Sequence, residues 1–196
     1  MFASRWLVVV AGLGLAAGVG RAGPRTEAQA LFEEGRRLLD DGQTAQACPK
    51  LAASSRLEPR VASKLSLASC YERLGRTASA WREYQEVAAL AAKAGDSEWQ
   101  REMYAIERVN ALEKKLVRLT ITVAETTPGL VIQRNGETVP PAQLGVAVPV
   151  NPGELVISAS APGKATWTRT VKIAKEPATS VAVPALKPAK APITDA

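Results

Sequence analysis

Hydrophobic residues recur at helical spacing through the first part of the chain. Between residues 27 and 116, leucines and other apolar residues return every three or four positions, and the breaks fall at glycines or before a proline. This pattern predicts five helices. Their expected ends lie at Gly42, Pro59, Gly75, Gly95 and Leu116.

The fifth of these helices has its own start signal and an apolar stripe. Residues 97–100 match a capping box, in which polar side chains satisfy the first backbone N–H groups of a helix. We expect the stripe to pack on the preceding helices as a cap; a partner-binding or dimer face is the alternative. Its residues are Met103, Ile106, Val109, Leu112 and Leu116.

After residue 117 the period of the pattern changes to two. Alternating apolar and polar residues predict short strands, and Asn135-Gly136 predicts a two-residue hairpin turn. The expected strands cover residues 119–123, 130–134, 146–149, 155–160, 165–173 and 180–183. Short strands with frequent turns are typical of a small antiparallel β-sandwich, so the expected fold class is α+β.

The first 22 residues have the pattern of a secretory signal peptide. Arg5 precedes an apolar run over residues 7–19, and Gly20 and Ala22 are the small residues of a cleavage site. The run is shorter than the roughly 18–20 apolar residues that span a bilayer, which disfavours an uncleaved anchor. We therefore expect cleavage after Ala22 and a periplasmic or secreted protein without a membrane span.

The last ten residues are rich in proline, alanine and lysine, which cannot bury an apolar face, so they are expected to be disordered. The expected organisation is then a signal peptide (1–22), a helical domain (23–117), a β-sandwich (118–186) and a tail (187–196).

The helical part repeats itself at an offset of 33 residues. Small residues coincide with small ones, large with large, and the turn glycines coincide. The matching pairs are Phe32 and Leu65, Gly35 and Ala68, Leu38 and Tyr71, Gly42 and Gly75, Ala47 and Ala80, and Leu51 and Tyr84. This period, with two helices per unit, resembles the tetratricopeptide repeat. The resemblance covers about residues 28–94 and implies two repeats plus a capping helix.

In that family the concave face commonly binds extended peptides. Carried to this sequence, the resemblance implies a partner-binding face formed by Phe32, Arg36, Leu39, Leu65, Ser69 and Glu72. The alternative is that Arg36 and Glu72 are ordinary solvated surface charges.

The strand part resembles a PEGA-type domain, or the similar carboxypeptidase-regulatory-like sandwich. The resemblance depends on residues 127–130, on Asn135-Gly136, and on residues 151–163, where one Pro-Gly turn leads into a strand and another ends it. It implies a non-catalytic domain of extracytoplasmic surfaces. The whole arrangement resembles exported envelope proteins of myxobacterial type.

The two cysteines are placed symmetrically about the turn at Pro59. Cys48 lies 11 residues before it and Cys70 lies 11 after it, so on antiparallel neighbouring helices both fall about 16 Å from the turn. In an oxidising compartment they are candidates for a disulfide. Two buried thiols that pack as small apolar side chains are the alternative.

The composition argues against catalysis. The chain has no histidine, which excludes Ser-His-Asp and Cys-His nucleophiles and HExxH zinc sites. Two cysteines 22 positions apart form neither a CxxC pair nor a four-thiolate metal site, so we expect no cofactor and no metal. The net charge of +6, or +4 without Arg5 and Arg21, is too small to indicate a nucleic-acid-binding protein.

These observations favour a non-catalytic interaction scaffold. The helical repeats are expected to bind a protein partner, and the sandwich to dock to the envelope or to another subunit. The alternative is a carbohydrate- or peptidoglycan-binding module in which Trp167 stacks on a sugar, although a strand tryptophan also commonly packs in a core. A glycosidase that uses carboxylates alone would need two carboxyl groups about 5–10 Å apart in a cleft.

Overall fold

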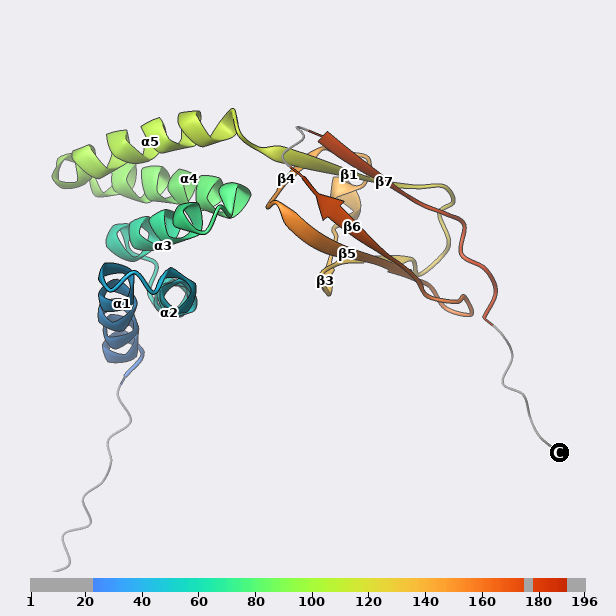
Figure 1. The fold of residues 1–196 in the computed structure, drawn as a ribbon, viewed down its shortest axis with the longest axis horizontal. Coiled ribbons are helices and arrows are strands. Elements are labelled where there is room, and N and C mark those ends of the chain that lie inside the picture. Colours follow the sequence, from blue (N-terminus) through green and yellow to red (C-terminus); the bar gives the residue numbers. More distant parts are fainter. Residues whose placement is uncertain (1–22, 175–177, 190–196) are drawn as a thin grey trace, which may run out of the picture.

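The computed structural model describes residues 23–174 and 178–189, in which five helices are followed by two sheets (Figure 1). The fold is therefore α+β, as the sequence predicts. The helices are α1 (Pro24–Asp40), α2 (Thr44–Leu57), α3 (Val61–Arg73), α4 (Thr77–Ala94) and α5 (Trp99–Glu113). The strands are β1 (Val117–Val123), β2 (Val131–Arg134), β3 (Glu137–Thr138), β4 (Val148–Val150), β5 (Gly153–Ser160), β6 (Trp167–Ile173) and β7 (Ala178–Val183). The expected signal peptide lies outside the described residues.

The turns within the pairs α1–α2 and α3–α4 have the same hydrogen bonds. In each turn the N–H of a glycine donates to the carbonyl three residues earlier, and the next N–H donates to the carbonyl five residues before itself. The glycines are Gly42 (φ 75°) and Gly75 (φ 68°). Glycine adopts a positive φ without steric cost, so two glycines 33 positions apart produce two turns of equal geometry.

The helices pack in chain order, each on the next, as Figure 1 shows for α1 to α5. Helices α1 and α2 are in close contact at Gly35, where an added Cβ would lie 2.7 Å from Leu51 Cγ. Because Leu51 is fully buried, only glycine fits opposite it. Thirty-three positions later, Ala68 and Tyr84 occupy the corresponding sites and are also fully buried.

Helix α5 buries only part of the expected apolar stripe. Leu112 and Leu116 are buried and Val109 packs against the core that α5 shares with α4, as expected, whereas Met103 and Ile106 are exposed and Ala105 is buried instead. Hydrophobicity alone would place Met103 and Ile106 in the core, but a small side chain such as that of Ala105 lets two helices approach closely.

The expected capping box is also wrong, because residues Asp96–Glu98 form a short 3₁₀ turn (η1) and α5 begins at Trp99 without a side-chain cap.

The strands form sheets of order β4-β1-β7 and β3-β2-β5-β6. The second sheet is antiparallel, and the predicted hairpin at Asn135-Gly136 is confirmed, since Arg134 pairs with Glu137 and both turn residues have positive φ. In the first sheet β1 pairs antiparallel with β4 but parallel with β7. The expectation of a wholly antiparallel arrangement is wrong here, because β6 and β7 lie in different sheets and β7 runs beside β1 in the same direction.

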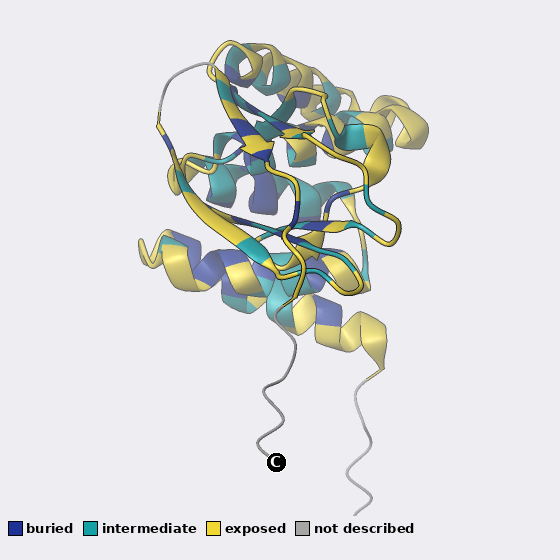
Figure 2. Cartoon of the chain, turned by 90° about the vertical axis from the view of Figure 1, so that its right-hand side faces the viewer, coloured by how far each residue is buried: buried dark blue, intermediate teal, exposed yellow. Residues whose placement is uncertain are grey.

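Residues from both sheets belong to one hydrophobic core. The first sheet contributes Leu119, Ile121, Val150, Val181 and Val183, and the second contributes Ile132, Leu155, Ile157, Ala159 and Ile173. Burial alternates along β5, where Leu155 and Ile157 are buried and Val156 between them is exposed. Figure 2 shows this mixture of buried and exposed residues along the elements.

The helical and strand parts are joined in two places. Residues 114–116 lead directly from α5 to β1. In addition, the Asn151 side chain binds the first turn of α4: its Oδ1 accepts a hydrogen bond from the Ser79 N–H (3.0 Å), and its Nδ2 donates to Ser79 Oγ (2.7 Å). The sequence pattern identifies Asn151 only as a turn residue.

The end of the described chain stays attached to the strand part. The Ala165 N–H donates to the Lys187 carbonyl, and the Ala189 N–H donates to the Gly163 carbonyl. Residues 187–189 of the expected tail are therefore hydrogen-bonded, and the remainder of that tail lies outside the described residues. Within the described ranges, no helix combines the length and the hydropathy that crossing a membrane requires.

Candidate functional site

Three helices that are separated in sequence line one hollow of about 320 Å³, which we call the α1–α3–α5 hollow. Residues at helical spacing on α1 and α3 line it together with one tyrosine of α5. They are Arg36, Leu39, Asp40, Leu65, Ser66, Ser69, Arg73 and Tyr104. Apolar and charged groups therefore share one concave surface.

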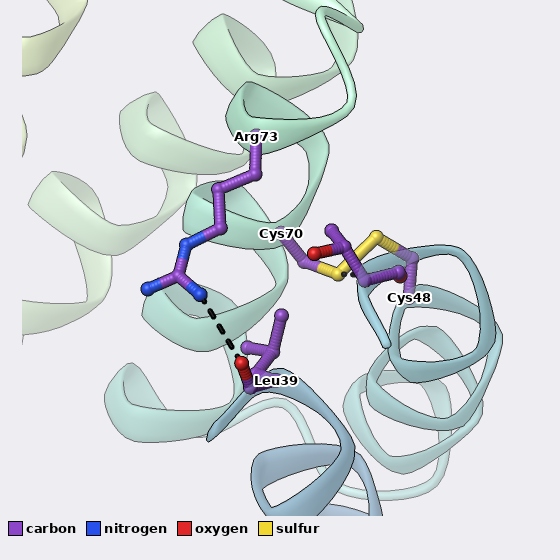
Figure 3. The surroundings of a disulfide bond; sticks show 5 residues. Leu39, Cys48, Cys70 and Arg73 are labelled. Carbon is purple, nitrogen blue, oxygen red and sulfur yellow. Dashed lines mark hydrogen bonds between the residues drawn. A yellow bond between two sulfur atoms is a disulfide. The ribbon is translucent and has the colours of Figure 1, made fainter. Parts of the chain in front are cut away.

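The hollow carries two arginines that are available to a ligand. Neither Arg36 nor Arg73 forms an ion pair with an acid of the described residues, and both are exposed. Arg73 Nη1 makes one long hydrogen bond, of 3.4 Å, to the Leu39 carbonyl at the end of α1 (Figure 3). Guanidinium groups bind carboxylates and backbone carbonyls well, so this surface suits a peptide segment.

The predicted concave residues divide between this hollow and other places. Arg36, Leu39, Leu65 and Ser69 line the hollow. Phe32 does not; it packs against the core of α1, α2 and α3 and borders a cavity of about 40 Å³ beside Ser54 and Ser63. Glu72 is not among the lining residues either.

Glu72 belongs instead to a polar cluster between α3, α4 and α5. It accepts hydrogen bonds from the Arg108 guanidinium and from the Tyr84 hydroxyl (3.1 Å), and the Tyr84 ring meets Tyr104 edge to face at 6.1 Å. The hydrogen bond to Glu72 raises the pKa of Arg108, against the opposing effect of its burial. This cluster fixes α5 on the helices before it, so Glu72 acts as a positioning residue.

Sequence reasoning missed Asp40, Ser66, Arg73 and Tyr104 as lining residues. Asp40 and Arg73 lie four positions after the predicted residues Arg36 and Ser69, so helical spacing contained the signal that finds them. Tyr104 lies 33 positions after Tyr71, but Tyr71 packs against the helical cores and does not line the hollow, so the offset alone does not place Tyr104 there.

The predicted pairing of the two cysteines is confirmed by a disulfide between Cys48 and Cys70, whose Cα atoms are 5.6 Å apart (Figure 3). It joins α2 to α3, and both residues are buried in the core beside Leu51 and Leu67. A disulfide of this kind fits an oxidising compartment. The disulfide therefore links the α1–α2 pair to the α3–α4 pair.

Trp167 begins β6 and is half-buried. Its ring packs against the core of the sheets, and it borders a second hollow of about 270 Å³ with Pro184 and Leu186. Packing accounts for most of its surface, which weakens the sugar-stacking alternative.

The described residues contain no group of three histidine, cysteine or acidic side chains that could hold a metal ion.

Comparison of the chain with protein-family models, with curated proteins and with solved structures finds no match. The geometry of the site is therefore what indicates the function.

Proposed function

We propose that this chain is an exported, non-catalytic interaction scaffold whose α1–α3–α5 hollow binds an extended segment of a protein partner. The observation that carries the proposal is the lining of that hollow. Arg36 and Arg73 offer guanidinium groups that form no ion pair with an acid of the described residues, and Leu65 and Tyr104 add apolar surface to the same hollow. Such a surface holds the carbonyls or carboxylates of a peptide and one apolar side chain.

Two features support a tetratricopeptide-like arrangement of the helices. The α1–α2 and α3–α4 turns have the same hydrogen bonds at an offset of 33 residues, and small residues lie at Gly35 and Ala68 where paired helices approach. In this proposal α5 takes the place of the first helix of a third unit, which explains why it contributes Tyr104 to the concave surface.

The shared core of the two sheets supports a β-sandwich of PEGA-like type, with the parallel β1–β7 pair as a departure from the expected pattern. We assign this part the role of docking to the envelope or to another subunit. The Cys48–Cys70 disulfide and the signal-peptide pattern of residues 1–22 support an exported protein.

The test is an affinity purification from an envelope extract, with the chain from Gly23 onward as bait. The informative variant is Arg36→Glu with Arg73→Glu, which reverses both charges of the hollow. Its matched control is Arg37→Glu, which changes the neighbouring residue of α1, an exposed arginine that pairs with Asp41. We expect the variant to retain a partner at least tenfold less than the wild type and the control to retain it equally.

Equal retention by the wild type and the double variant would place recognition elsewhere and overturn the proposal. A parallel purification on cell-wall material with Trp167→Ala tests the glycan alternative, since stacking on a sugar requires that ring.

A further inference from the structure

A second polar cavity, of about 260 Å³, lies where the helical part meets the strand part. The start of α4, the β2–β3 hairpin and the segment from β4 to β5 line it. The polar lining residues are Arg76, Ser79, Arg82, Arg134, Asn135, Glu137 and Asn151. We call it the junction cavity.

The junction cavity has an excess of positive charge. Three arginines line it against one carboxylate, that of Glu137, among the described lining residues. Arg76, Arg82 and Arg134 form no ion pair with an acid of residues 23–174 and 178–189, and Arg76 lies instead over the Tyr71 ring at 5.5 Å. One carboxylate does not balance three guanidinium groups, which repel one another until a further anion lies between them.

Arg134 occupies a position that the fold itself does not explain. It is paired with the fully buried Ile157 and shares the face of β2 that carries the buried Ile132, so the pleat turns it toward the core side of the sheet. Its Nη1 is buried and has no hydrogen-bond acceptor among the described residues. An inward-pointing charge can protect an exposed edge strand from pairing with another chain. That does not explain Arg134, because β2 is an inner strand between β3 and β5.

We propose that the junction cavity binds a phosphate group, held by Arg134 and Arg82 with Arg76 beside them. The guanidinium edges of Arg134 and Arg82 that line the cavity would donate to phosphate oxygens, because a planar guanidinium group matches two oxygens of a tetrahedral dianion. The partial positive charge at the start of α4 acts in the same direction.

A ligand in this cavity would touch both parts of the molecule. Arg82 belongs to α4 and Arg134 to β2, and Ser79 and Asn151, which are hydrogen-bonded to each other, also line the cavity. Binding would therefore add a link across the junction, beyond the peptide binding proposed for the helices.

The test is a titration of the chain from Gly23 onward with inorganic phosphate at constant ionic strength, followed through the backbone amides of Ser79 and Asn135 by NMR. We expect saturable shifts, a tenfold or greater loss of affinity in Arg134→Gln, and at least a threefold loss in Arg82→Gln. Because Arg82 is exposed, that variant keeps the test valid if Arg134→Gln does not fold. The control is Arg56→Gln on α2, which should bind phosphate as the wild type does.

Two further arms distinguish the source of the phosphate. One uses glucose 6-phosphate, and the other uses phosphatidylcholine vesicles with and without phosphatidic acid. If glucose 6-phosphate binds and the binding depends on Arg134 and Arg82, the proposal is supported and the source is a soluble phosphate. If only vesicles with phosphatidic acid bind in this way, the source is a lipid phosphate. Shifts that do not saturate, or equal affinities in the wild type and both variants, overturn it.

Discussion

At the scale of single residues, Tyr84 is the largest fully buried side chain of the described chain. Its hydroxyl donates to Glu72 at 3.1 Å, and the ring packs on Tyr104. Burial, with smaller contributions from Tyr104 and Glu72, raises the pKa of Tyr84 well above the ordinary tyrosine value, because a buried phenolate beside a carboxylate is unfavourable.

This shift has a definite sign for stability. Above pH 10 an unfolded chain releases the Tyr84 proton while the folded chain keeps it, so the free energy of unfolding falls by roughly 1.4 kcal/mol per pH unit. Below about pH 9 Tyr84 is protonated in both the folded and the unfolded chain, so its contribution to the free energy of unfolding does not change with pH.

We predict that Tyr84→Phe is less stable than the wild type by about 1–2 kcal/mol at pH 7, through loss of the hydrogen bond to Glu72.

Because Tyr84→Phe has no hydroxyl at this position to titrate, it does not lose stability above pH 10 through this group. The difference in the free energy of unfolding between the wild type and the variant should therefore narrow by roughly 1.4 kcal/mol by pH 11. Urea unfolding of both proteins at pH 7, 9 and 11 measures it. A constant difference across this range would show that Tyr84 titrates normally in the folded chain.

At the scale of elements, the Cys48–Cys70 bond ties α2 to α3. It closes a loop across 22 positions, and in the entropic view such a loop stabilises by roughly 3 kcal/mol. We predict that reductant lowers the Tm of the wild type by about 9–15 °C, since 1 kcal/mol shifts the Tm of a domain of this size by about 3–5 °C. The double variant Cys48→Ala with Cys70→Ala should have the Tm of the reduced wild type, whether or not reductant is present. If reductant leaves the Tm of the wild type unchanged, the expected stabilisation by the disulfide is contradicted.

At the scale of the whole molecule, Asn151 holds the strand part against the first turn of α4. We predict that Asn151→Ala speeds hydrogen exchange of the Ser79 amide about tenfold, which corresponds to about 1.4 kcal/mol, because Asn151 Oδ1 is the acceptor of that N–H. The internal control is the Ala80 amide, which donates to the Arg76 carbonyl and should exchange as before. Equal exchange at Ser79 in both proteins would mean that the junction opens without Asn151.

Much of the helical fold could be predicted because its signals are local. Gly42 and Gly75 mark the turns, where both have positive φ, and the offset between them indicates the pairing of helices. The resemblance to the tetratricopeptide repeat then implied a face with Arg36, Leu39, Leu65 and Ser69, all of which line the hollow. The cysteine pairing also followed, since helix rise and the position of the turn fix the heights of Cys48 and Cys70.

The misplaced features all depend on contacts between distant segments. Glu72 has the same helical spacing as the lining residues, but Arg108, 36 positions later, draws it into the cluster with Tyr84. Likewise, the exposed side of Met103 follows from the way α5 packs on α4, and the parallel pairing of β7 follows from the sheet that it joins.

The sequence by itself determined which segments form helices and strands, where they turn, and which cysteines can meet, because backbone preferences and the periodicity of apolar residues act over a few positions. Only the tertiary structure decided which face of α5 is buried, that Tyr104 completes the hollow, and that Arg76, Arg82 and Arg134 share one cavity. These juxtapositions depend on side-chain shape and on the relative placement of whole elements, for which one sequence carries no local signal.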